Sequence, residues 1–224
     1  RYNTLVFVPP PWREIYTQDA ERRQTFEDCL AVHAVVLATL ESLDYRPVEL
    51  AHGTTAERAA VYADLARVLA ALHRIDWRAA GLDGFGRPDG YMARQIALWT
   101  QQWHAARCED VAEMDLLADW LPRHLPPDDE PACIAHGDFR LGNVLLHPAQ
   151  PRVVAVLDWE LATIGHPLAD LAYACLTYHF DGGPTGSEGV AGEDLARTGI
   201  PGQREFVADY CAQMGRPVPE SLDV

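Results

Sequence analysis

IAHGDFRLGNVLLH, residues 134–147, places two short apolar runs on either side of a polar loop. The loop holds Asp138 and Asn143, five positions apart, and Asp138 directly follows a His-Gly pair. The apolar ends are typical of short buried strands. Oxygen-bearing side chains between such strands have two interpretations: an ordinary turn, or a loop that handles phosphate and metal. The surrounding sequence must distinguish the two.

The sequence after the loop predicts a β-hairpin that returns the chain to it. Residues 143–147 form one strand, residues 148–151 the turn and residues 153–157 the other strand. The two ends of a hairpin lie within about 10 Å of each other, because neighbouring strands are only about 4.8 Å apart. We therefore expect Asp158, at the end of the second strand, to face the polar loop.

The converging side chains offer the groups that phosphoryl transfer needs. Mg²⁺ prefers oxygen ligands, usually one or two carboxylates together with waters and phosphate oxygens. Asn143 and Asp158 can supply such oxygens, and Glu160 can add a second carboxylate. Asp138 can accept or orient the proton of an attacking hydroxyl group.

Three further residues are expected to support this site. We interpret His136 as a residue that packs and hydrogen-bonds within the loop, in preference to one that transfers a proton. Asp170 lies just inside a predicted helix N-terminus, where a carboxylate can accept backbone N–H groups from a neighbouring loop. Arg140 has two interpretations, a contact with substrate or phosphate and a solvated loop side chain.

The rest of the sequence predicts a mainly helical α+β fold around the hairpin. Helical patterns extend over residues 56–76, 91–108, 111–125, 170–180 and 204–215. The Gly-rich stretches 81–90 and 181–194 are expected to be loops. The first contains no GxGxxG pattern and follows no strand, so we do not expect it to bind phosphate.

Composition excludes several classes of protein. The chain has 224 residues, 48% of them apolar, which is enough for one large domain or two small ones. A formal net charge of −15 argues against nucleic-acid binding. No apolar run is long enough to span a membrane, and the first residues show no signal peptide. The five cysteines form no CxxC pair, so neither a disulfide framework nor a zinc site is expected, and a cytoplasmic location is.

Two motifs in this order resemble the aminoglycoside phosphotransferase / choline kinase family: HGDFRLGN at residues 136–143 and VLDWELATIGHPLADLAY at residues 156–173. Together with GFGRPDGYMARQIALWTQQW at residues 84–103, they resemble most the kinase-like domains associated with acyl-CoA dehydrogenases. The resemblance covers about residues 55–220 and implies the C-terminal lobe of a protein-kinase-like fold.

The resemblance also implies an activity and a site. In such proteins the Asp of the first motif is the catalytic base, which implies Asp138. The Asn of that motif and the Asp of the following strand hold magnesium, which implies Asn143 and Asp158. The family uses Mg²⁺ and ATP, and it transfers the γ-phosphate to a hydroxyl group of a small molecule. The subgroup points towards hydroxyacyl-type substrates.

The N-terminal part departs from this family. Kinases of this type cover the nucleotide with a small β-lobe that carries a Gly-rich loop and a Lys. This chain contains no Lys, because all 18 basic residues are Arg. Residues 1–52 instead predict a strand, a helix from Asp19 and a second strand, and they resemble the C-terminal part of a small P-loop ATPase family. We expect two parts, residues 1–52 and 53–224, with the small kinase lobe missing.

Three hypotheses for function follow. The first is a phosphotransferase that uses Asp138, Asn143 and Asp158. The second is a non-catalytic module, pseudokinase-like or truncated or chimeric, which the missing Lys favours. The third, a regulatory P-loop ATPase fragment, rests on residues 1–50 alone, and these contain no phosphate-binding element. The complete set of polar residues in the loop and hairpin favours the first.

Overall fold

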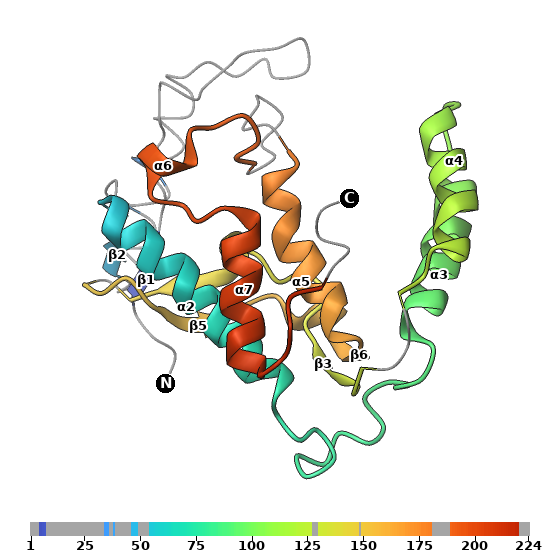
Figure 1. The fold of residues 1–224 in the computed structure, drawn as a ribbon, viewed down its shortest axis with the longest axis horizontal. Helices are drawn as coiled ribbons and strands as arrows, with labels where there is room; N and C mark the ends of the chain where they lie inside the picture. Colours follow the sequence, from blue (N-terminus) through green and yellow to red (C-terminus); the bar gives the residue numbers. More distant parts are fainter. Residues whose placement is uncertain are drawn as a thin grey trace. The chain divides into compact units, whose positions relative to one another are not determined.

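The computed structural model describes residues 5–7, 34–35, 38, 46–48, 54–126, 130–147, 149–180 and 189–219. The chain divides into two compact units, whose elements are drawn in Figure 1. Unit 1 comprises Arg1–Val68, Arg140–Leu157 and Ala174–Val224. Unit 2 comprises Leu69–Phe139 and Asp158–Tyr173.

Unit 2 combines helices with one short antiparallel sheet. Its helical elements are α3 (Tyr91–Ala106), α4 (Ala112–Trp120), η1 (Leu121–Arg123), η3 (Trp159–Leu161), the end of α2 (Thr55–His73) and most of α5 (Pro167–Cys175). The sheet pairs β3 (Cys133–Ala135) with β6 (Thr163–Gly165), and Ile134 lies opposite Ile164. The sequence predicted β3 but not β6.

The core of unit 2 gathers around this sheet. Leu72, Trp77, Ile134 and Ile164 form a buried cluster, and Leu82 and Ala132 pack against it. The indole N–H of Trp77 donates to the Ala132 carbonyl oxygen over 3.0 Å, so the ring is buried with its polar group paired. The pairing of β3 with β6 thus places two β-branched side chains, Ile134 and Ile164, against the end of α2.

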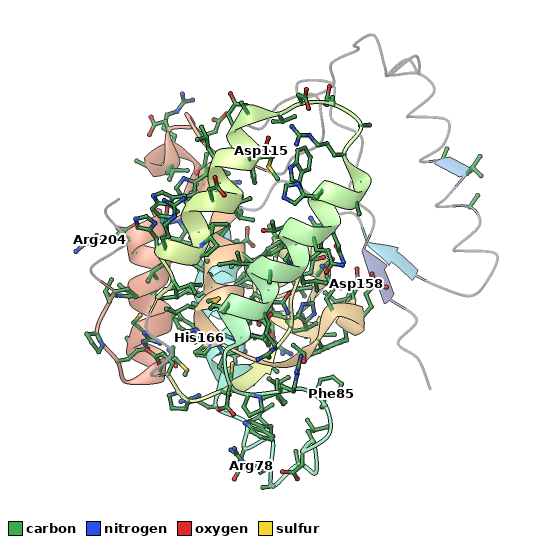
Figure 2. The ribbon with its side chains drawn as sticks, turned by 90° about the vertical axis from the view of Figure 1, so that its right-hand side faces the viewer. Arg78, Phe85, Asp115, Asp158, His166 and Arg204 are labelled. Carbon is green, nitrogen blue, oxygen red and sulfur yellow. The ribbon has the colours of Figure 1, made fainter. Side chains whose placement is uncertain are left out.

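The Gly-rich loop at residues 81–90 lies against β6. The hydroxyl of Thr163 donates to the carbonyl oxygen of Phe85, which is labelled in Figure 2. A Cβ atom on Gly86 would lie only 2.4 Å from Thr163 Oγ1 and 2.6 Å from the Ile164 nitrogen. A glycine is therefore needed at position 86, because the loop backbone approaches strand β6 closely there. This role explains the glycine without any bound phosphate.

Unit 1 contains the predicted hairpin and the rest of the helices. Its elements are the first part of α2, β1 (Leu5–Phe7), β2 (Arg46–Val48), η2 (Leu141–Asn143), β4 (Val144–Leu146), β5 (Val153–Val156), η4 (Leu176–Tyr178), α6 (Leu195–Thr198) and α7 (Gln203–Met214). Strands β4 and β5 are antiparallel, with an irregularity between Leu145 and Leu146. The hairpin prediction is confirmed, with strands slightly shorter than expected.

Helices α2 and α7 lie side by side in Figure 1, and their side chains pack together. The rings of Tyr62 and Phe206 stand 6.2 Å apart and nearly perpendicular. The Asp64 carboxylate on α2 also accepts the Val153 N–H of β5 over 2.6 Å. Helix α2 therefore anchors both α7 and the hairpin.

The N-terminal strands are present as a parallel pair in which Leu5 lies opposite Arg46. Of the helix predicted between them, only residues 34, 35 and 38 belong to the described part, and they are helical. Its predicted start at Asp19 lies outside the described residues, as does most of the loop at residues 181–194. Among the helices that the structure describes, none is long and apolar enough to cross a membrane.

Candidate active site

A buried carboxylate holds the loop that follows β3. Asp170, in the first turn of α5, is 1% exposed. Its Oδ2 atom accepts the N–H of His136 over 2.6 Å, and its Oδ1 atom accepts the N–H of Gly137 over 2.8 Å. Hydrogen bonds to an ionised acceptor are stronger than neutral ones. The contacts are those expected of a scaffold, and they fix the backbone directly before Asp138.

A third group reaches the same carboxylate. The Nε2 atom of His73, the last residue of α2, lies 3.2 Å from Asp170 Oδ2. Both side chains are fully buried. The sequence analysis did not select His73. The signal was available, because His73 stands four residues after the buried Leu69 and so continues the apolar stripe of α2.

His136 and Gly137 bring a second segment to the loop. The Nδ1 atom of His136 accepts the N–H of Asp138 over 3.2 Å, and the His136 ring lies 4.7 Å from the Trp159 ring. Gly137 has φ = +87°, and a Cβ there would lie 2.8 Å from Leu161 Cβ. The segment that begins at Asp158 therefore packs directly on the loop that carries Asp138. The packing interpretation of His136 agrees with these contacts.

Asp158 has an unusual backbone conformation. With φ = +63°, it is the only non-glycine residue of the described part in the left-handed region. This conformation is unfavourable by about 1–2 kcal/mol for most residues and is tolerated best by Asn and Asp. Such strain is often found at functional sites. The Asp158 side chain, marked in Figure 2, is exposed, and so is that of Glu160 in η3.

Asn143 lies in unit 1, at the open end of the hairpin. It is 7% exposed, and its carbonyl oxygen accepts the N–H of Leu157 over 2.8 Å. Leu157 directly precedes Asp158 in the chain, so the hairpin returns to Asn143 where the sequence predicted. Arg140, which precedes η2, is exposed.

The donor set suits a hard cation. Asn143, Asp158 and Glu160 offer only oxygen ligands, and Mg²⁺ takes few such protein ligands because it keeps waters and phosphate oxygens. Within the described ranges, no three His, Cys, Asp or Glu side chains gather into a metal-holding group. The assignment of Asn143, Asp158 and Glu160 to a magnesium ion stays a prediction.

Two buried groups near the loop have raised pKa values. Burial raises the pKa of the Cys133 thiol in β3, so no reactive thiolate forms there at neutral pH. Burial, and then the charge of Asp170, raises the pKa of Tyr91. Asp138 directly follows the anchored backbone. Its role as a catalytic base stays a prediction.

Comparison with known proteins identifies the family of this chain. The profile of the phosphotransferase enzyme family matches residues 9–213. The chain belongs to this family. A protein of Ralstonia eutropha JMP134, described as an aminoglycoside phosphotransferase, has 44% sequence identity and a TM-score of 0.71 over 76% of this chain and 51% of its own. An aminoglycoside-3'-phosphotransferase of type VIII, at 23% identity and a TM-score of 0.54, shares the fold.

The relatives found by sequence comparison are longer proteins than this chain. Acyl-CoA dehydrogenase family member 11 of Rattus norvegicus is 40% identical over 181 residues, which are 80% of this chain and 23% of that protein. Acyl-CoA dehydrogenase family member 10 of Mus musculus is 41% identical over 160 residues, which are 71% of this chain and 15% of that protein. The chain thus spans less than a quarter of either relative.

The family match also bears on the N-terminal part. It begins at residue 9 and so includes most of the segment at residues 1–52 that the sequence analysis separated. The boundary near residue 52 and the resemblance of this segment to P-loop ATPases stay predictions.

Proposed function

We propose that this chain is the catalytic part of an ATP- and Mg²⁺-dependent phosphotransferase that acts on a hydroxyl group of a small molecule. One observation supports the proposal most directly. Asp170 fixes the backbone before Asp138, and the segment that begins at Asp158 packs on the same loop. The two segments that carry the proposed base and one proposed metal ligand are thus in contact within unit 2.

Each polar residue has a role in this proposal. Asp138 accepts or orients the proton of the attacking hydroxyl group. Asn143 and Asp158 would hold Mg²⁺, with Glu160 as a further carboxylate. When bound, the ion would neutralise charge on the phosphate oxygens. Arg140 is exposed and can reach either solvent or a phosphate group.

We further propose an acceptor of the hydroxyacyl type, which the names of the rat and mouse relatives support. The location we propose is the cytoplasm. In the described part of the chain, Cys108, Cys133, Cys175 and Cys211 form no disulfide, as a reducing compartment favours. Cys108 is exposed, whereas the other three are buried.

Thermal unfolding with and without Mg-ATP tests the metal and nucleotide site. A ligand at 100 times its Kd stabilises a protein by about 2.7 kcal/mol, which raises Tm visibly. We expect this shift in the parent chain and its loss in Asp158→Asn. Asn tolerates the left-handed backbone of residue 158, so the variant removes the charge without adding strain. Asp83→Asn, in an exposed loop of unit 2, is the matched control and should keep the shift.

Phosphoryl transfer from radiolabelled ATP to hydroxyacyl acceptors tests the chemistry. The parent chain should label the acceptor, and Asp138→Asn should not. A parent that gains stability from Mg-ATP but labels no acceptor would support the non-catalytic alternative, which the absence of Lys from the chain favours. A parent with no Mg-ATP shift would contradict nucleotide binding by this chain.

A further inference from the structure

An open groove lies on the surface of unit 2, between α3 and the segment formed by α4 and η1. Its volume is about 540 Å³, within the range of about 300–1,000 Å³ that small-molecule sites occupy. None of the candidate catalytic or metal-binding residues lines it. We propose that this groove binds the chain of a hydroxyacyl acceptor and thereby selects the acceptor. The inference rests on the proposed function and adds the site that would hold the substrate.

The walls of the groove are mostly apolar, and many of their side chains are small. On α3 the lining residues recur every three or four positions and so lie on one side of the helix. The helix α4, which the structure describes in full, has no buried residue, so the core of unit 2 does not fill the space between the helices. The apolar lining residues are Ala93, Ile96, Ala97, Ala118, Pro122 and Leu125.

Polar contacts near the turn between α3 and α4 hold the two helices together without filling the groove. The indole N–H of Trp103 donates to Asp115 Oδ1 over 3.5 Å, and the Arg107 guanidinium donates to Asp115 Oδ2 over 2.9 Å. Asp115 is labelled in Figure 2, and none of these three residues lines the groove. The groove is therefore formed before a ligand binds, which lowers the entropic cost of binding.

The polar groups of the groove gather toward the C-terminal end of α3. Thr100, Gln101 and His104 offer a hydroxyl, an amide and a ring nitrogen that can donate hydrogen bonds. Of the described residues that line the groove, none is Asp or Glu, although the chain has a formal net charge of −15. A carboxylate or an acyl carbonyl group thus meets donors there and no acidic side chain. This polarity places the acyl end of a ligand at Gln101 and His104, with its chain along the alanines.

The apolar end of the groove leads toward the loop that carries Asp138. Tyr91, the buried first residue of α3, packs on β6, because a Cβ atom on Gly165 would lie 2.8 Å from Tyr91 Cε2. Strand β6 pairs with β3, which leads directly into the loop. The groove begins at Ala93, and from there to His104 helix α3 rises by about 16 Å, at about 1.5 Å per residue. A chain whose acyl end lies at His104 therefore extends toward the side of α3 that packs beside the loop.

Saturated fatty acids test the groove without any catalysis. NMR titration of the chain with hexanoate and decanoate gives both dissociation constants. A methylene group strengthens binding about fourfold when fully buried and about twofold when half-buried, so decanoate should bind at least about tenfold more tightly than hexanoate. Ala97→Phe fills the groove and should weaken decanoate binding about tenfold or more. Gln102→Phe is the matched control, because it adds the same ring on the opposite side of α3 and should leave binding unchanged.

The polar end of the groove is tested by the head group of the ligand. A hydrogen bond to a charged group contributes enough to change affinity by about tenfold or more. The double variant Gln101→Leu with His104→Leu should therefore weaken binding of decanoate by about that factor. Binding of decan-1-ol, which has the same chain and no charge, should change much less. Equal losses for the two ligands would overturn the placement of the acyl end.

Phosphoryl transfer then tests whether the groove serves the proposed reaction. The acceptors are hydroxydecanoates that carry the hydroxyl group on successive carbons. For each acceptor that the parent chain phosphorylates, Ala97→Phe should raise KM about tenfold and leave KM for Mg-ATP unchanged, because the groove contacts only the acceptor. Gln102→Phe should change neither constant.

The outcomes separate this inference from the proposed function. Failure of decanoate to bind the parent chain, or equal binding to the parent and to Ala97→Phe, would overturn the inference. Decanoate binding that Ala97→Phe removes, in a parent that phosphorylates no acceptor, would retain the groove as an acyl site and reject the proposed function. Phosphorylation of hydroxydecanoates with KM unchanged in Ala97→Phe would retain the function and reject the groove.

The variants are expected to fold, because Ala97 and Gln102 are both exposed. The Tm of each variant is measured beside that of the parent. If Ala97→Phe lowers Tm, Ala93→Phe takes its place, since Ala93 is an exposed alanine of the same wall. The same loss of decanoate binding is expected from it, and unchanged binding would contradict the inference.

Discussion

At the scale of single residues, the loop before Asp138 requires that residue 137 has no Cβ atom. The φ angle of Gly137 is +87°, and a Cβ would lie 2.8 Å from both Cβ and the carbonyl oxygen of Leu161. Gly137→Ala therefore adds a clash to the conformational penalty of about 1–2 kcal/mol. We expect a loss of more than about 2 kcal/mol in the free energy of unfolding, measured in urea, and loss of phosphoryl transfer.

Gly81 provides the matched comparison for this prediction. It has φ = +75° and no atom within 4 Å of the position that a Cβ would take. Gly81→Ala should therefore show the conformational penalty alone and leave activity unchanged. Equal losses of stability in the two variants would mean that contact with Leu161 does not constrain the loop.

At the scale of elements, the N-terminus of α2 carries a pH-dependent cap. The Glu57 carboxylate accepts the N–H of Thr54 over 2.6 Å and its hydroxyl hydrogen over 3.0 Å, and the Thr54 hydroxyl oxygen accepts the Glu57 N–H. The backbone hydrogen bond from Thr54, followed by the hydroxyl contact, lowers the pKa of Glu57. The cap is thus a reciprocal capping box.

The lowered pKa of Glu57 determines how the stability of the fold changes with pH. A carboxylate with a depressed pKa in the folded state stabilises the fold above the pKa of an unfolded Glu, about 4.3, and loses this contribution as pH falls through the folded value. We expect the difference in unfolding free energy between the parent and Glu57→Gln to be largest at neutral pH and to shrink below about pH 4.3. Thr54→Ala should lower stability by about 1 kcal/mol and weaken this pH dependence. A difference that stays constant down to pH 3 would contradict the capping role.

The elements also show what the sequence could predict. The hairpin of β4 and β5 was predictable because its apolar runs and its prolines are local signals. Strand β6 was not, because Thr163–Gly165 is too short for a pattern and is defined by its pairing with β3, about 30 residues earlier in the chain. The need for a glycine at position 86 was likewise not predictable, because it comes from a close contact with Thr163, which is distant in the sequence.

The residues of the candidate site likewise fall into two groups: those that the local sequence predicts and those that only the fold reveals. Spacing within the two motifs was enough to select Asp138, Asn143 and Asp158 as candidates, because each is close in sequence to a strand end. The support of the loop was only half visible: the helix start indicated Asp170, but its partner His73 comes from a helix 97 residues earlier. Sequence patterns predict side chains that share an element, whereas contacts between distant elements need the fold.

At the scale of the whole molecule, we expect the excess of negative charge to affect thermal stability. The chain has 33 acidic and 18 basic residues and a formal net charge of −15 at pH 7. Like charges repel more strongly in the compact state than in the unfolded chain, and salt screens them, with a Debye length of about 30 Å at 0.01 M and about 8 Å at 0.15 M. We expect Tm at pH 7 to rise when NaCl is raised between these concentrations.

The pH dependence of this salt effect identifies its cause. Near pH 4.9, the isoelectric point given by the sequence, net repulsion vanishes, so the same increase in NaCl should leave Tm unchanged or lower it by weakening ion pairs such as Arg107–Asp115. Differential scanning calorimetry at both pH values measures the effect. If Tm at pH 7 fell with NaCl, attractive ion pairs would outweigh repulsion, and the net charge would not limit the stability of this chain.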